Sequence, residues 1–192
     1  IASGQYNTVL ENKFDTFDGG FSIPRELFWP ETYTADGSKL LITLGYYEGA
    51  SAAIYYPNGD ALVQLTGGEG AMICCGETEW TSDGSAFYAA SPTFGMFSAG
   101  LWRVDATTGK VTTLLSGSFD TNPLNLADEP FLAPDGQLYF FHATMPGGTD
   151  MVNRAALQLV RAGTDGVANR TVLRPETFER MNEALWAPDA SF

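Results

Sequence analysis

The sequence has few of the residues on which most catalytic and metal sites depend. It contains one histidine, His142, and two cysteines, Cys74 and Cys75, which are adjacent and cannot connect distant segments of the chain. It has no G-x-S-x-G motif, the turn that carries the nucleophile of the α/β-hydrolases. The sequence therefore predicts no catalytic residue, no metal site and no cofactor, and it favours a protein that acts by binding.

Basic residues are also scarce. The chain has 10 Lys and Arg against 23 Asp and Glu, which gives a formal net charge of −13. Nucleic-acid binding requires basic patches that neutralise phosphate, and an anionic membrane surface likewise attracts basic segments. No apolar run in the sequence approaches the ~18 residues of a membrane-spanning helix. We therefore expect no nucleic-acid partner and no direct insertion into a membrane.

The residues that are abundant suit a protein made of many short strands. Hydrophobic residues make up 44% of the chain and aromatic residues 13%, which is enough to fill a sizeable core. The 21 glycines and 10 prolines mark frequent turns. This composition favours an all-β fold over one built from a few long helices.

A short turn motif recurs along the chain. Its four copies are Ala35-Asp36-Gly37, Ser82-Asp83-Gly84, Pro134-Asp135-Gly136 and Pro188-Asp189-Ala190. Successive aspartates are 47, 52 and 54 residues apart, close to the roughly 40–50 residues of a propeller blade. A bulky apolar residue stands three positions before each aspartate: Tyr33, Trp80, Leu132 and Trp186. This spacing is typical of a packed strand that enters a hairpin.

Each repeat divides into four expected strands. Apolar runs follow the first three turns at Lys39–Leu44, Ala86–Ala90 and Leu138–His142. Further strands and Gly-containing turns follow, with fourth strands expected at Ala61–Thr66, Val111–Ser116 and Arg170–Arg174. The pattern predicts a single β-propeller domain of four-stranded antiparallel blades over residues 1–192. We expect three full blades, at about 30–66, 77–116 and 129–174, with terminal strands at 5–10 and 183–192.

The segment Glu129–Gly136 resembles the repeat of the TolB-type propellers, which reads E-P-x-W-x-P-D-G. The resemblance covers about residues 30–192, and it implies an extracytoplasmic protein, periplasmic or at the cell surface, that serves as an interaction platform. Related repeats occur in prolyl oligopeptidase-like enzymes. A gating propeller whose catalytic domain is absent from this chain is therefore the alternative function, and an all-β sandwich is the alternative fold.

Antiparallel strand order divides the loops of such a propeller between two faces. The tight Asp-Gly and Asn-Gly turns share one face, and the long loops share the other, which we call the long-loop face. The expected long loops are 11–30, 45–51, 67–77, 91–99, 116–129, 143–154 and 175–183. They carry 14 acidic residues and four basic ones. We therefore expect an acidic face that binds a protein or peptide, with a cationic partner favoured.

Nine residues at the expected long-loop face are candidates for partner contact: Tyr46, Tyr47, Glu48, Glu77, Phe94, Phe97, Glu129, His142 and Asp150. Several have a structural alternative. Glu77 and Glu129 belong to the repeat motif and can serve as hydrogen-bonding groups within it. A histidine at the end of an apolar strand is more often a hydrogen-bonded rim residue than a catalyst. For Cys74 and Cys75, a vicinal disulfide and two buried free thiols both remain open, with free thiols favoured.

Three full blades and one strand at each end cannot close a ring of complete four-stranded blades. The two open ends should therefore expose apolar blade faces, and we expect Trp186 and Phe192 to be stranded on one of them. We expect further blades, or another chain packed against both ends, to cover these faces.

Asp15-x-x-Asp18-Gly19-Gly20 lacks the spacing of a calcium loop, so a solvated turn is favoured there.

Overall fold

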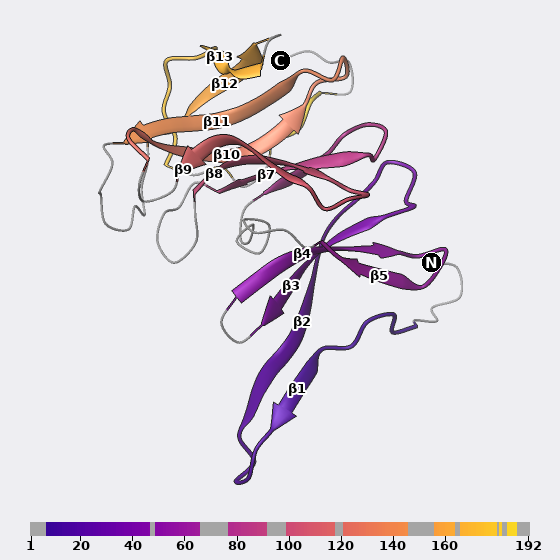
Figure 1. Cartoon of the computed structure of the whole chain (residues 1–192). Coiled ribbons are helices and arrows are strands. Elements are labelled where there is room, and N and C mark those ends of the chain that lie inside the picture. Colours follow the sequence, from indigo (N-terminus) through magenta and orange to yellow (C-terminus); the bar gives the residue numbers. More distant parts are fainter. Residues whose placement is uncertain are drawn as a thin grey trace.

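The computed structural model describes residues 7–46, 49–65, 77–91, 99–117, 121–145, 156–163, 166–179, 181 and 184–187. This part of the chain consists of 13 β-strands in three antiparallel sheets (Figure 1). Among the described residues no helix is long and apolar enough to cross a membrane. The sheets follow one another along the chain, and we call them blades 1, 2 and 3.

Each blade is a meander in which strands adjacent in sequence are adjacent in the sheet. Blade 1 contains β1 (Lys13–Thr16), β2 (Ser22–Tyr33), β3 (Leu40–Tyr46), β4 (Gly49–Tyr56) and β5 (Ala61–Gln64). Blade 2 contains β6 (Thr78–Trp80), β7 (Ala86–Ser91), β8 (Ala99–Asp105) and β9 (Val111–Gly117). Blade 3 contains β10 (Leu124–Leu132), β11 (Leu138–Met145), β12 (Gln158–Gly163) and β13 (Gly166–Val172). The predicted four-stranded antiparallel blades are confirmed, with β1 as one additional strand at the edge of blade 1.

Apolar side chains fill the space between blades 1 and 2. Leu41 and Ile54 of blade 1 pack in one cluster with Trp80 and Phe87 of blade 2, and the rings of Trp80 and Phe87 meet edge to face with centroids 5.4 Å apart. The indole Nε1–H of Trp80 also donates to the carbonyl oxygen of Thr32 at 3.1 Å. The inner strands β2 and β6 are thereby held next to each other.

Blades 2 and 3 share a second core. Leu101 and Leu115 of blade 2 pack with Phe140 and Val160 of blade 3, and all four are buried. Strand β10 lies against the four strands of blade 2, as expected for the inner strand of the next blade. Because alternate residues of a strand point to opposite faces, each blade contributes one set of side chains to each neighbouring interface.

The Asp-Gly turns are closed by hydrogen bonds of their own residues. In blade 2, the Thr81 hydroxyl donates to Asp83 Oδ1 at 2.7 Å, and the backbone N–H of Ser85 donates to the same oxygen at 3.0 Å. Gly84 has a φ of +62°, which glycine adopts without strain. These bonds favour the ionised carboxylate and lower the pKa of Asp83 to about 2. Asp36 in blade 1 has the equivalent bonds and the same lowered pKa.

The N-terminal segment differs from the prediction. Residues 7–10 form no strand, although a terminal strand was expected at 5–10. Segment 11–30, expected to be a loop, contains β1 and the first part of β2, joined by a turn at Asp18-Gly19-Gly20. Leu10 packs with Leu40 and Tyr55 on the face of blade 1 that points away from blade 2. The N-terminal segment of the chain therefore covers part of the outer face of blade 1.

The C-terminal segment covers the other end. The ring of Trp186 lies 5.0 Å from that of Tyr139 and 5.9 Å from that of Phe131, so the expectation that Trp186 would be stranded is wrong. Phe192 lies outside the described residues. Residues 184–187 form no strand, in contrast to the strand expected over 183–192. Buried carboxylates hold the segment in place, because Asp128 Oδ2 accepts the N–H of Met181 at 3.1 Å and Glu129 Oε1 accepts that of Ala184 at 2.8 Å.

The turn chemistry gives a first prediction. Thr81→Val keeps the shape of the side chain but removes the hydroxyl that bonds to Asp83 and to the backbone of Ala86. We expect the free energy of unfolding to fall by about 1 kcal/mol, measured by chemical denaturation. Thr112→Val, at an exposed position on β9, is the matched control and should leave stability unchanged or slightly raised. Equal effects of the two substitutions would contradict the role given to the turn.

Candidate binding site

The strand registers distinguish the two faces of the molecule. The β2–β3, β6–β7 and β10–β11 turns lie on one face, where aspartates and threonines bond to the backbone of their own turns. The opposite ends of the same strands form the long-loop face. Here β11 ends at Met145, β9 ends at Gly117 and β10 begins at Leu124.

A cleft of about 750 Å³ opens at the long-loop end of blade 3. It is lined by residues of three neighbouring strands and the approach to β12, and these are His142, Ala143, Thr144, Met145, Ala156, Gln158, Val160, Ala168, Arg170 and Val172. His142 and Gln158 stand directly opposite each other in the register of β11 and β12. The volume is within the roughly 300–1,000 Å³ of small-molecule sites.

A hydrogen-bond chain fixes the protonation of His142. Asn125 Nδ2 donates to the carbonyl oxygen of Ser116 at 2.9 Å, so its amide oxygen faces His142 and must accept from the imidazole Nε2–H at 3.0 Å. The other ring nitrogen, Nδ1, is then an acceptor, and Arg170 Nε donates to it at 3.3 Å. Burial, together with the charge of Arg170, lowers the pKa of His142 to about 4. The imidazole is therefore neutral with its proton on Nε2.

Arg170 completes the polar part of the cleft. Besides its bond to His142, it donates from Nη1 to the carbonyl oxygen of Val167 at 3.1 Å. Partial burial lowers the pKa of its guanidinium, which nonetheless stays charged at physiological pH. In the described part of the chain no carboxylate forms an ion pair with Arg170.

A close approach of two blades positions this group. A Cβ atom added at Gly117 would lie 2.3 Å from the backbone oxygen of Asn125 and 2.5 Å from that of Ala99. Only glycine allows β9 and β10 to come this near each other. The approach brings the Ser116 carbonyl within reach of the Asn125 side chain, which in turn orients His142.

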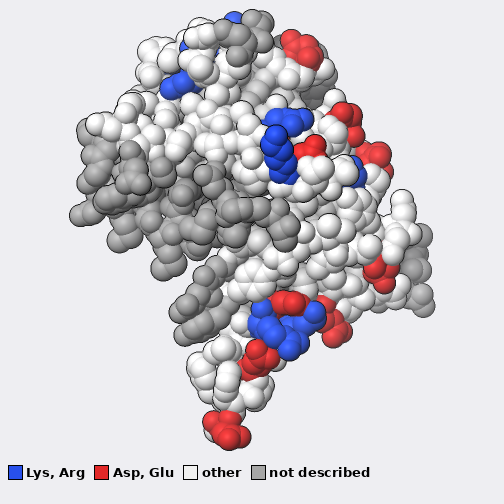
Figure 2. All heavy atoms as spheres, in the orientation of Figure 1, with Lys and Arg blue, Asp and Glu red and all other residues white. Residues whose placement is uncertain are grey.

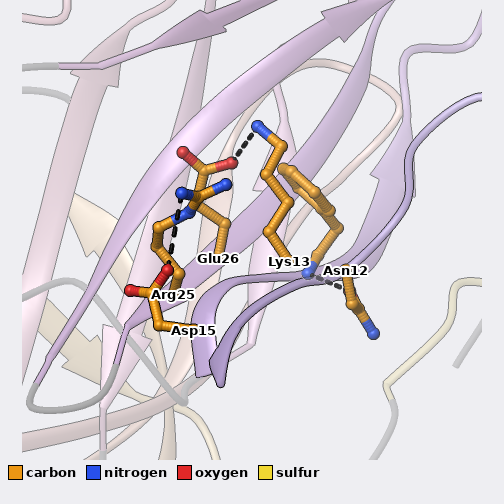
Figure 3. Close-up of polar contacts among 6 residues, drawn as sticks. Asn12, Lys13, Asp15, Arg25 and Glu26 are labelled. Carbon is orange, nitrogen blue, oxygen red and sulfur yellow. Dashed lines mark hydrogen bonds and ion pairs between the residues drawn. The ribbon is translucent and has the colours of Figure 1, made fainter. Parts of the chain in front are cut away.

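The β1–β2 hairpin is a second feature of the long-loop face. It projects beyond the end of β3, away from the other strands of blade 1 (Figure 1). Its phenylalanines Phe14, Phe17 and Phe21 are 52%, 53% and 65% exposed. Ion pairs join Lys13 to Glu26 and Arg25 to Asp15, the latter at 3.5 Å (Figure 3). Figure 2 shows basic side chains gathered beside acidic ones in this lower part of the molecule.

The structure separates the residues that were predicted to contact a partner. Tyr46 is half-buried at the end of β3, and Glu77 is exposed just before β6. Glu129 is buried and bonded to Ala184, and His142 is buried beside Arg170, so neither presents much surface to a large partner. The remaining five lie outside the described residues: Tyr47, Glu48, Phe94, Phe97 and Asp150.

The charge of the long-loop face is also more mixed than its composition indicated. Asp128 and Glu129, two of the 14 acidic residues counted there, are buried and bonded to the C-terminal segment. Asp15 and Glu26 are paired with basic neighbours of the hairpin. Exposed acidic residues of the expected long loops include Glu11, Asp18, Glu77, Glu176 and Glu179.

Three polar residues of the site were not predicted from the sequence. Asn125, Gln158 and Arg170 are scattered over 46 positions, and no motif joins them. The strand periodicity could have found part of the group, because antiparallel pairing of the second and third strands of a blade places Gln158 across from His142. The role of Asn125 depends on its hydrogen bond to Ser116 of a different blade, and a local sequence pattern cannot predict such a contact.

The neutral His142 gives a prediction on pH. The unfolded chain takes up a proton near pH 6.5, whereas the folded chain does so only near pH 4. Between these values the unfolded state binds more protons, so stability should fall as the pH falls, by about 3 kcal/mol in total. Denaturant titrations across this range should show the slope in the wild type and its loss in His142→Gln.

A control variant separates this effect from that of the turn carboxylates. The pKa of Asp83 is lowered from 3.8 to about 2, so its contribution is present above pH 4 and is lost between pH 4 and 2. Asp83→Asn should therefore change the pH profile below the range that belongs to His142. An identical slope between pH 6.5 and 4 in the wild type and His142→Gln would contradict a buried neutral imidazole.

Comparison with known proteins shows similarity at the level of structure. No protein-family model and no curated protein sequence matches the chain. TolB from Acinetobacter baumannii matches 83% of the chain and 35% of its own length, with a TM-score of 0.50 and 17% identity. A putative TolB from Agrobacterium tumefaciens matches 85% of the chain and 60% of its own length, with a TM-score of 0.51 and 15% identity.

A third structure, an oligogalacturonate lyase from Vibrio parahaemolyticus, gives a TM-score of 0.49 at 15% identity over 86% of the chain and 47% of its own length. The chain thus spans about a third to three fifths of the solved structures that it resembles. At these identities the similarity concerns the fold. It agrees with the turn spacing and the stacked four-stranded blades, and the chain therefore has the β-propeller fold of the TolB-type repeat proteins.

Proposed function

We propose that this chain is a non-catalytic β-propeller module that binds a protein or peptide through its long-loop face. The difference between the two faces supports this most directly. The tight-turn aspartates Asp36, Asp83 and Asp135 are used within their own turns. The long-loop face instead has the cleft beside His142 and the projecting β1–β2 hairpin.

The hairpin suits contact with a protein or peptide. Phe14, Phe17 and Phe21 are all more than half exposed and lie within eight residues of one another. Aromatic residues are enriched in the cores of protein interfaces, where their burial contributes to affinity. A strand pair held by two ion pairs presents these rings on a defined backbone.

Charge favours a cationic partner. The expected long loops carry 14 acidic and four basic residues, and the chain as a whole has a net charge of −13. A field of this sign accelerates the approach of basic ligands. The TolB-like fold, through the resemblance of its repeats, supports an extracytoplasmic location in which the module serves as an interaction platform.

A defined peptide tests this proposal. The probe is acetyl-Lys-Phe-Lys-Phe-Lys-amide, with acetyl-Glu-Phe-Glu-Phe-Glu-amide as its charge-reversed control. We expect the basic peptide to bind more tightly than the control, and we expect its affinity to fall as the salt concentration rises, because exposed charges are screened beyond roughly 10 Å at 0.1 M. Glu77→Gln should weaken binding about two- to threefold. Glu31→Gln, near the tight-turn end of β2, is the matched control and should have no effect.

Fluorescence anisotropy of the labelled peptide measures these affinities, and it also tests the role of the hairpin. Phe17→Ser with Phe21→Ser should weaken binding about tenfold, since each exposed ring that becomes buried contributes on the order of 1 kcal/mol or more. Val63→Ser, at an exposed position on β5, is the control for a general loss of apolar surface. Equal affinity for the two peptides, or an affinity that the hairpin substitutions leave unchanged, would contradict the proposal.

A further inference from the structure

The cleft of blade 3 contains a cation in an otherwise uncharged lining. Arg170 is the one charged residue among the described residues that line it, and the others are apolar or carry neutral amide, hydroxyl or imidazole groups. This is unusual for a chain with a net charge of −13. Since no carboxylate of the described residues pairs with it, this half-buried guanidinium has lost part of its hydration without gaining an ionic partner there.

The donor groups of Arg170 show where a ligand would bind. Its Nε and one Nη1 hydrogen are used by His142 and by the carbonyl oxygen of Val167. Its Nη2 lies 3.2 Å from His142 Nε2, but that nitrogen carries the proton donated to Asn125 and cannot accept another. The two Nη2 hydrogens therefore have no acceptor among the residues that the structure describes.

We propose that this cleft binds a carboxylate group attached to a small apolar body. Arg170 Nη2 would donate to the carboxylate, as guanidinium groups commonly do in charge-assisted pairs. Met145, Val160 and Val172 line the cleft and would contact the apolar part. Burial lowers the pKa of the Arg170 guanidinium, and an anion beside the group would raise that pKa again and stabilise the charge.

His142 has a positioning role in this arrangement. Because its Nε2–H is given to Asn125, its Nδ1 accepts from Arg170 Nε and fixes the plane of the guanidinium. The imidazole adds no second charge, since it is neutral above about pH 4. The cleft therefore offers one positive charge with a fixed direction, which suits a single carboxylate.

Such a carboxylate can come from a free organic acid or from the C-terminus of a peptide. Hexanoate represents the first source and acetyl-Ala-Val the second. Hexanamide and acetyl-Ala-Val-amide have nearly the same shape without the charge, and they are the matched controls. The inference does not rest on the proposed peptide partner, because these probes lack the basic side chains on which that proposal depends.

Titration of the wild-type chain followed by ¹⁵N NMR is the first test. We expect at least one carboxylate probe to bind and to shift the side-chain signals of Arg170 and His142, with its amide twin about tenfold weaker or more. The probe of the pair that binds more tightly identifies the source. Absence of binding by both carboxylates, equal binding of an acid and its amide, or shifts confined to other residues would overturn the inference.

Variants supply the second test. Arg170→Gln should lower the affinity for the carboxylate probe about tenfold or more. Arg170→Lys should keep part of that affinity, because lysine retains the charge but lacks the planar guanidinium fork. Arg174→Gln is the control, since it removes the same charge from an exposed residue that lines a different, smaller cleft beside Phe141 and Phe178. Equal loss in Arg170→Gln and Arg174→Gln would show a general charge effect and contradict the site.

Discussion

The burial of one blade's apolar face against the next blade is the interaction on which the rest of this structure depends. Phe87 and Phe140, the largest fully buried side chains, each lie in an interface between two blades. A single four-stranded sheet would leave both of its faces in water, so no blade here can be stable alone. Polar groups follow this packing: the Trp80 indole bonds to blade 1, and the Asn125 amide bonds to blade 2.

The same packing produces the electrostatics of the candidate site. Stacking brings β9 and β10 together at Gly117, and the Asn125 amide then fixes the proton of His142 on Nε2. Desolvation keeps that imidazole neutral and leaves the charge of Arg170 without an ionic partner in the described part of the chain. The orientation of the polar groups in the cleft thus depends on how two blades meet, and not on any sequence motif.

The sequence predicted the repeating part of the fold well, for a local reason. An Asp-Gly turn specifies its own geometry through hydrogen bonds that span a few residues, as at Asp36 and Asp83. Such a turn can therefore be recognised from the sequence wherever it occurs. The β1–β2 hairpin was missed because it adds a strand outside this repeat. The covering roles of Leu10 and Trp186 were missed because they depend on contacts between blades and terminal segments. Of the candidate site, only His142 was predicted.

Nitrogen-15 NMR of the imidazole ring tests this account most directly. The chain has one histidine, so the spectrum contains a single imidazole system to assign. If blades 2 and 3 meet as described, His142 at about pH 6 will show a protonated Nε2 and an unprotonated Nδ1 that accepts a hydrogen bond, because its pKa is near 4. A positively charged ring at that pH, or a proton on Nδ1, would contradict the arrangement of Asn125, His142 and Arg170.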